Sequence, residues 1–260
     1  HLICYSMKAC SNLSILRIFS NLGSGLDIVS GGELFRGLQA GVPPSRIVYS
    51  GVGKKPSEID EALAADILMF NVESQEELLM LDQRAQAMGK RARMALRVNP
   101  DVDPGTHPYI ATGLKKSKFG IDVGSAVELY VKAKDMKGLD PVGLDCHIGS
   151  QLTELSPFLD AIDRLKRLMR ELKDRGVTIR YLDIGGGLGI PYEDEQPPIP
   201  AEYGDAIVKQ IADMNVSLIL EPGRLLVGNA GVLVSRVLYQ KQGPTKYFII
   251  VDAAMNDLIR

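Results

Sequence analysis

Eight short apolar runs, separated by segments of helical length, constrain the fold of this chain more than any other feature of its sequence. Most of the runs are near-continuous rather than alternating, which is typical of parallel strands covered on both faces. They lie at residues 2–5, 26–29, 47–49, 67–72, 94–98, 142–146, 181–184 and 217–220. This pattern predicts an α/β fold in which strands and helices alternate.

The segments between the runs carry the start and stop signals of helices. Serine residues open the clearest three, two of them with a glutamate three residues later, and a glycine follows each. The three openings are Ser74, Ser125 and Ser156, and the glycines that follow them are Gly89, Gly138 and Gly176. Pro157 is expected at the first position of the third of these helices, which proline favours.

Eight strand-then-helix units within about 220 residues fit a (β/α)8 barrel of the TIM type, since such barrels take roughly 250 residues. An open, doubly wound sheet is the alternative. After the eighth run, residues 231–241 and 246–251 are predicted to be successive strands with no helix between them. We therefore expect a barrel over residues 1–230 and the beginning of a β-rich domain over residues 231–260, in a fragment truncated at both ends.

Charge and cysteine content exclude several classes of protein. The formal net charge is -2, which argues against a basic face for nucleic acid, and the most apolar stretch is interrupted by charged residues and proline, so no membrane span is expected. Three cysteines are too few for a disulfide framework or a thiolate zinc site, and no metal is expected. A reducing cytoplasm is the expected location.

In a barrel, chemistry lies where the strands end at the carboxyl face, and four predicted strand ends are unusual. The first leads into Lys8. A lysine there can be merely solvated, but a partly desolvated amine with a lowered pKa is also a candidate Schiff-base nucleophile. The sixth leads into His147 and Ser150. The histidine is either a buried structural residue or a flat ring facing the mouth of the barrel.

The seventh and eighth strand ends suggest an anion site. Residues 183–189 read Asp-Ile-Gly-Gly-Gly-Leu-Gly, a turn whose exposed N–H groups suit a phosphate. A dinucleotide-binding loop is the competing interpretation, but its glycine fingerprint is incomplete and prolines follow where its helix should run. Residues 221–224 read Glu-Pro-Gly-Arg. Glu221 and Arg224 either neutralise each other or contribute a carboxylate and a second phosphate contact.

An amine, a stacking ring, a phosphate cradle and a buried carboxylate are together what pyridoxal 5'-phosphate needs. With these residues at its strand ends, the chain resembles the barrel domain of the bacterial meso-diaminopimelate decarboxylases, which are fold-type III pyridoxal-phosphate enzymes with an alanine-racemase-like barrel. The resemblance extends over essentially all of the chain. The segments that carry it are residues 5–9, 25–33, 70–74, 97–121, 147–151, 185–192, 221–224 and 256–260.

The resemblance implies roles for individual residues. Lys8 would bind the cofactor covalently, His147 would stack on its ring, and Glu221 would keep the ring nitrogen protonated. The phosphate would be contacted by Ser150, Gly187 and the turn formed by Pro222, Gly223 and Arg224. Arg224 and Arg260 would bind substrate carboxylates. The family also implies a cytoplasmic homodimer in which the partner chain completes the active site.

The resemblance implies decarboxylation of meso-2,6-diaminopimelate to L-lysine and CO2, the last step of lysine biosynthesis. A sister decarboxylase acting on ornithine, arginine or carboxynorspermidine is the first alternative, and a non-catalytic pyridoxal-phosphate-binding protein is the second. Residues 97–121 and Gln151 favour diaminopimelate, and Lys8, His147, Glu221 and Arg260 together argue against a protein without turnover. Cys10 is a departure, because relatives usually carry asparagine there.

Overall fold

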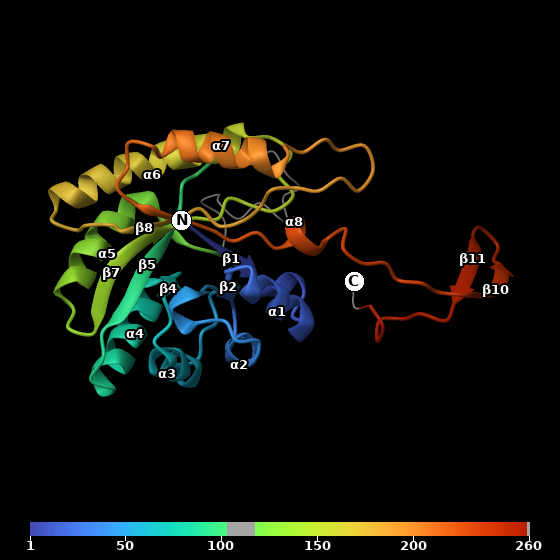
Figure 1. Cartoon of the computed structure of the whole chain (residues 1–260), viewed down its shortest axis with the longest axis horizontal. Helices are drawn as coiled ribbons and strands as arrows, with labels where there is room; N and C mark the ends of the chain where they lie inside the picture. The colour runs from blue at the N-terminus through green and yellow to red at the C-terminus, as the bar shows by residue number, and fades with distance from the viewer. Residues whose placement is uncertain (103–117, 259–260) are drawn as a thin grey trace.

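Eight parallel strands close into a barrel in the computed structural model, which describes residues 1–102 and 118–258 (Figure 1). Each strand pairs with two neighbours, and the ring closes where β1 pairs with β9. The strands are β1 (Leu2–Ser6), β2 (Gly25–Ile28), β3 (Ile47–Tyr49), β4 (Met69–Val72), β5 (Ala92–Asn99), β7 (Leu139–Asp145), β8 (Tyr181–Asp183) and β9 (Ser217–Leu220). This closure confirms the predicted (β/α)8 barrel and excludes the open sheet.

The helices surround the barrel and complete the alternation of strand and helix (Figure 1). They are α1 (Leu13–Asn21), α2 (Gly31–Gln39), α3 (Pro56–Ala65), α4 (Gln75–Ala87), α5 (Val123–Asp135), α6 (Ser156–Asp174), α7 (Pro200–Gln210) and α8 (Arg224–Val227). A two-residue strand, β6 (Ile121–Asp122), and two short 3₁₀ turns, Met7–Ala9 and Pro44–Arg46, complete the described elements.

Helix boundaries follow the local signals, with two corrections. The smaller one is that α6 begins at Ser156, so Pro157 is its second residue and not its first. The Ser74 hydroxyl accepts the backbone N–H of Glu77 at 3.1 Å, as the capping box predicts. Ser125, however, does not begin its helix, because the carboxylate of Asp122 accepts the N–H of Gly124 at 2.9 Å and α5 starts at Val123. An aspartate three residues earlier therefore supplies the cap that we had expected from Ser125.

Alternate residues of each strand face opposite sides of the barrel wall. Tyr5, on β1, faces outward and packs against Phe19 of α1, with ring centroids 4.5 Å apart. Its neighbour Ser6 faces inward, opposite Asp27 of β2 in the parallel register. Outward residues form the large core between strands and helices. Inward residues form a second, smaller cluster inside the barrel, made of Cys4, Val48, Leu68, Met69, Ala95, Val142 and Ile219.

Beyond α8 the chain leaves the barrel and forms the antiparallel hairpin β10 (Val237–Gln242) and β11 (Tyr247–Val251), drawn in red in Figure 1. Both strands are exposed along their whole length. The predicted strand over residues 231–241 begins later than expected, because β11 supplies pairing partners only for Val237–Gln242. None of the helices in the described ranges is long and apolar enough to cross a bilayer.

Candidate active site

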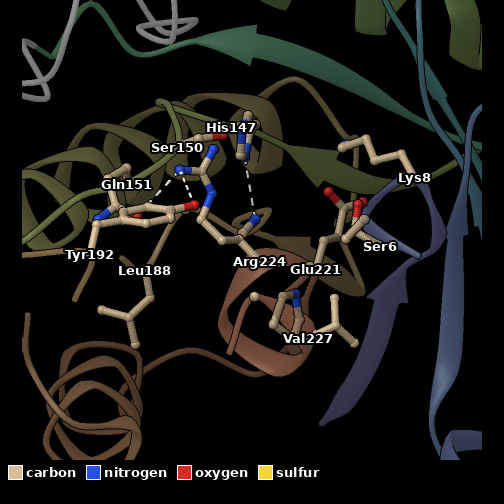
Figure 2. A pocket seen from close by; sticks show the side chains of 16 residues that line it. Ser6, Lys8, His147, Ser150, Gln151, Leu188, Tyr192, Glu221, Arg224 and Val227 are labelled. Atoms are coloured by element: carbon tan, nitrogen blue, oxygen red, sulfur yellow. Dashed lines mark hydrogen bonds between the residues drawn. The ribbon is translucent and has the colours of Figure 1, made fainter. Parts of the chain in front are cut away.

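One cavity of about 500 Å3 opens at the carboxyl end of the barrel strands, and it is lined by residues from the four strand ends that the sequence singles out (Figure 2). Lys8 follows β1, His147 and Ser150 follow β7, the glycine turn follows β8, and Glu221 follows β9. The four segments are far apart in the sequence. Barrel closure brings them together because β7, β8, β9 and β1 are consecutive neighbours in the sheet.

At and below the floor of this cavity, every barrel strand contributes at least one buried polar residue near its carboxyl end. Each of these residues is at most 7% exposed. The set that we call the polar ring takes one of them from each strand, and its members are Ser6, Asp27, Ser50, Asn71, Arg97, Asp145, Asp183 and Glu221. Bonds across the barrel show that they share its interior, since Asn71 of β4 donates to Asp183 of β8 at 3.3 Å and to Glu221 at 3.3 Å.

Lys8 lies at the edge of the polar ring, beside Asp27. Its Nζ is 3.5 Å from Asp27 Oδ2, and that same oxygen accepts the Ser6 hydroxyl at 2.7 Å. The Asp27 carboxylate raises the pKa of Lys8 above its ordinary value, and this effect exceeds the opposing effect of burial. The sequence leaves open whether Lys8 is solvated or is a desolvated amine with a lowered pKa. In this structure the pKa is raised, because a buried carboxylate stands next to the amine.

Glu221 belongs to a compact group of carboxyls. One carboxylate oxygen from each of Asp145, Asp183 and Glu221 lies within 4.8 Å of the other two, and all three residues are buried. Burial raises the pKa of Glu221 well above its ordinary range, and the charges of Asp183, Asp27 and Asp145 raise it further. Burial also raises the pKa of Asp183, to about 7. Like charges this close cannot all ionise cheaply, so the group retains protons near neutral pH.

The glycine turn is dictated by close packing of backbones. Gly185 has φ +67°, and a Cβ there would lie 2.7 Å from His147 Nδ1. A Cβ on Gly186 would collide with the carbonyl oxygen of Glu221, and one on Gly187 with that of Gly149. Side chains are therefore excluded where the turn meets both neighbouring strand ends, and Gly186 and Gly187 still line the cavity.

His147 contacts this turn directly, because the N–H of Gly186 donates to His147 Nδ1 at 3.3 Å. Burial lowers the pKa of His147 well below its ordinary value, and the positive charges of Arg97 and Lys8 act in the same direction. The imidazole is thus neutral at physiological pH. With Nδ1 accepting a hydrogen bond, the ring proton is on Nε2.

Arg224 begins α8 and extends along the cavity wall toward Tyr192 and Gln151 (Figure 2). Its guanidinium lies over the Tyr192 ring, 5.7 Å from the centroid, and donates to the Tyr192 hydroxyl at 3.2 Å and to Gln151 Oε1 at 3.5 Å. It forms no ion pair with Glu221 or any other carboxylate within the described ranges. The two residues therefore do not neutralise each other here.

The cavity collects nearly all of the predicted site residues. Lys8, His147 and Glu221 line it, as do the residues expected to hold a phosphate, namely Ser150, Gly187, Pro222, Gly223 and Arg224. Arg260 lies outside the described residues, as does most of the family segment 97–121. The structure thus brings together in one place every predicted site residue that it describes, while their chemical roles remain predictions.

Sequence reasoning missed most of the polar ring. It named Gln151 only as a feature that favours diaminopimelate and Tyr192 only as the end of a family segment, and it gave neither a place in the cavity wall. A signal for the ring was present, because one polar residue interrupts or ends each apolar run, as in Leu26-Asp27-Ile28 and Leu182-Asp183-Ile184. Gln151 carries a conformational mark, a φ of +61° that few non-glycine residues adopt, but this appears only in the coordinates. Nothing in the sequence distinguishes Tyr192 from a surface tyrosine.

Comparison with protein families gives one match over most of the chain. The family described as "Pyridoxal-dependent decarboxylase, pyridoxal binding domain" matches residues 1–228. Among curated proteins, diaminopimelate decarboxylase of Aquifex aeolicus is 50% identical over 260 residues, which is 100% of this chain and 62% of that protein. The protein of that name from Vibrio cholerae is 53% identical over 261 residues, covering 100% of this chain and 63% of its own length.

Solved structures that superpose on this chain are also decarboxylases. Diaminopimelate decarboxylase from Helicobacter pylori, complexed with L-lysine, superposes with a TM-score of 0.94 at 45% identity, covering 100% of this chain and 65% of that one. Lysine decarboxylase from Selenomonas ruminantium superposes with a TM-score of 0.86 at 28% identity, covering 98% of this chain and 64% of that one. The chain spans less than two thirds of the length of these relatives.

Proposed function

This chain belongs to the pyridoxal-dependent decarboxylase family, and from that premise we propose that its parent protein converts meso-2,6-diaminopimelate to L-lysine and CO2. The observation that carries the proposal is the single cavity lined by Lys8, His147, Glu221 and Arg224. An amine, a neutral imidazole, a carboxyl and a guanidinium match the aldehyde, ring face, ring nitrogen and phosphate of pyridoxal phosphate. The donor set therefore fits the cofactor that the family binds.

Lys8 is the residue that we propose bonds the cofactor. Among the residues that the structure describes, it is the only lysine that lines the cavity. When bound, the pyridoxal ring supplies an electron sink for the electron pair left behind as a carboxylate departs. To bond a carbonyl carbon, Lys8 must first give up the proton on its Nζ, which Asp27 opposes.

Glu221 is proposed to hold a proton at the ring nitrogen. Its raised pKa favours the protonated carboxyl, and a cation placed beside it would favour its ionised form. Asn71 donates to Glu221 Oε1 at 3.3 Å, which fixes the orientation of the carboxyl. His147, whose pKa is lowered mainly by burial and further by nearby cations, presents an uncharged ring suited to stacking.

The phosphate and the substrate carboxylates are proposed to bind at the wall formed by α8 and the glycine turn. Ser150, Gly187 and the Pro222–Gly223 turn would bind the phosphate. Arg224 is available to an incoming anion, because Gln151 and Tyr192 orient its guanidinium without cancelling its charge. Arg260 is proposed as a second carboxylate anchor, from the family resemblance alone.

The choice of substrate rests on the relatives. The three relatives named diaminopimelate decarboxylase above are 45–53% identical to this chain, whereas the named lysine decarboxylase is 28% identical. Diaminopimelate has a second carboxylate that ornithine and arginine lack, so it gains most from an additional arginine. A decarboxylase for ornithine, arginine or carboxynorspermidine and a non-catalytic pyridoxal-phosphate-binding protein are the alternatives that the assay below must exclude.

We also propose a cytoplasmic homodimer whose partner chain completes the active site, and a second domain beginning near residue 231. The exposed hairpin supports this organisation, since Phe248, Ile249 and Ile250 are 45%, 59% and 41% exposed on a strand with no other cover among the described residues. Light scattering of the full-length protein tests it. A mass of one chain at micromolar concentration would contradict the dimer.

The experiment that tests the function is a decarboxylation assay on the full-length protein loaded with pyridoxal phosphate. We expect CO2 and L-lysine from meso-diaminopimelate, at a kcat/KM far above that for ornithine, arginine or L-lysine as substrate. Equal rates on the monocarboxylic amino acids would overturn the substrate assignment. Bound cofactor with no release of CO2 from any amino acid would favour the non-catalytic alternative.

A further inference from the structure

Within the described part of the chain, Asp27 is the one carboxylate in contact with the amine that we propose bonds the cofactor, and neither the sequence motifs nor the family comparison gives it a role. Its side chain is fully buried, whereas the Lys8 side chain is 58% exposed. A buried carboxylate needs hydrogen bonds and a nearby cation, because transfer from water is costly without them. Ser6 supplies a hydrogen bond at 2.7 Å, and Lys8 is the only ion-pair partner of Asp27 in the described ranges.

The surroundings of Asp27 make its carboxylate depend more strongly on the charge of Lys8. The polar ring holds four carboxyls and one guanidinium, that of Arg97, and Arg97 is already paired with Glu73 at 3.0 Å. Asp27 Oδ1 is buried without a hydrogen-bond partner in the described structure. Lys8 is therefore the cation that compensates this side of the ring.

We propose that Asp27 is a positioning residue that holds a proton on Lys8 Nζ and keeps this nitrogen at the mouth of the barrel. The strand register makes the arrangement rigid, since Ser6 and Asp27 are paired residues of β1 and β2, two residues before Lys8. The inference deepens the proposed function, because its importance rests on Lys8 bonding the cofactor. Its physical content, the proton affinity of Lys8, does not depend on turnover.

Several other groups act on Lys8 and must be separated from Asp27. Burial and the positive charge of Arg97 lower the pKa of Lys8, while Glu221 raises it. The titratable or charged side chains that interact with Lys8, apart from Asp27, are Glu33 on α2, Arg97 on β5, His147 after β7 and Glu221 after β9. Asp27 is the largest influence among them, so removing its charge alone should reverse the direction of the shift.

The test is competitive labelling of cofactor-free, full-length protein with acetic anhydride between pH 7 and pH 11, read by mass spectrometry of the peptide that carries Lys8. The exposed Lys132 in the same digest is the reference. In the natural protein, Lys8 should titrate above its ordinary value of 10.5. In Asp27→Asn it should titrate below that value, so its labelling at pH 9 relative to Lys132 should rise about tenfold for each unit of decrease.

Ser6→Ala is the matched control, because it removes a hydrogen bond to Asp27 while leaving the carboxylate in place. Its Lys8 should still titrate above 10.5. If Asp27→Asn fails to fold, the natural protein alone still tests the proposal, since a Lys8 pKa at or below the ordinary value would contradict it. Unchanged labelling of Lys8 in a folded Asp27→Asn protein would also overturn it.

A spectroscopic readout separates this inference from the proposed function. In the loaded protein, the pH at which the visible absorption of the cofactor changes should be lower in Asp27→Asn than in the natural protein, because a proton on Lys8 Nζ is then held less strongly. Absence of turnover on diaminopimelate would contradict the proposed function and leave this shift intact. A shift absent from both labelling and absorption would contradict the role of Asp27 alone.

Discussion

The two ends of the barrel interior are built from the same eight strands but obey different chemistry. Toward the amino ends, inward residues form the apolar cluster that contains Cys4, Met69 and Ile219. About two residues farther along the same strands, the inward positions are Ser6, Asn71 and Glu221 of the polar ring. About two residues along each strand thus separate an apolar layer that stabilises the fold from a polar layer that carries charge. Stability and chemistry should therefore be separable by mutation.

The largest expected effect comes from the polar ring. Glu221→Gln keeps the shape of the side chain but removes the carboxyl that we propose exchanges a proton with the nitrogen of the pyridoxal ring, so we expect turnover to fall roughly a hundredfold or more. Cofactor absorbance should remain. Steady-state kinetics and the visible spectrum of the full-length protein measure both quantities.

The matched control lies on the same strand. Ile219→Val, two residues before Glu221 and fully buried in the apolar cluster, should cost about 1 kcal/mol of stability and leave kcat unchanged. Normal turnover in Glu221→Gln would contradict the chemical role that we propose for the polar ring.

The apolar end should respond in the opposite way. Met69 is fully buried, and Met69→Ala leaves a cavity between β4 and Gly143 of β7, so we expect a loss of about 2–5 kcal/mol in unfolding free energy. The kcat of the remaining folded protein should be close to normal. Denaturant unfolding and kinetics of the same preparation test this. A large fall in kcat with unchanged stability would show that the two layers are not independent.

The polar ring should also give the barrel a distinctive pH dependence. Asp183 has a pKa raised to about 7 in the folded state, so between its ordinary pKa and pH 7 the native state binds a proton that the unfolded state has lost. Its stabilising contribution is therefore complete at low pH and is lost as the pH rises through about 7. Asp145 and Glu221, whose pKa values are also raised, act in the same direction.

Asp183→Asn isolates the contribution of Asp183. The melting temperature of the cofactor-free protein should decline less between pH 5 and pH 8 in this variant than in the natural protein. The loss of a hydrogen bond from Asn71 lowers the melting temperature of the variant by a similar amount at every pH. The slope of melting temperature against pH is therefore the informative quantity. Parallel slopes would mean that Asp183 does not take up the extra proton.

The smallest effect is expected at the cavity wall. Tyr192→Phe removes the hydroxyl that accepts from Arg224 at 3.2 Å but keeps the ring beneath the guanidinium. One hydrogen bond of this kind contributes about 0.5–1.5 kcal/mol, so KM for diaminopimelate should rise roughly two- to tenfold with little change in kcat. An unchanged KM would indicate that Tyr192 does not orient Arg224 for the substrate.

The barrel and most of its mouth could be predicted from sequence because both depend on local patterns. Short apolar runs determine the strands, and barrel geometry then places Lys8, His147 and Glu221 at one rim. The properties that depend on neighbours distant in sequence could not be predicted. The sequence left the direction of the pKa shift of Lys8 open, because the residue that raises this pKa, Asp27, lies nineteen residues away. The cap at Asp122 was missed because the serine at 125 carries an equally good local signal.

The central claim is that the cofactor is bonded to Lys8 at the mouth of this barrel. Reducing the loaded full-length protein with sodium borohydride, digesting it and locating the pyridoxyl group by mass spectrometry tests the claim directly. The account predicts the label on Lys8 and its loss in Lys8→Ala. A label on any other lysine, or one that persists in Lys8→Ala, would contradict it.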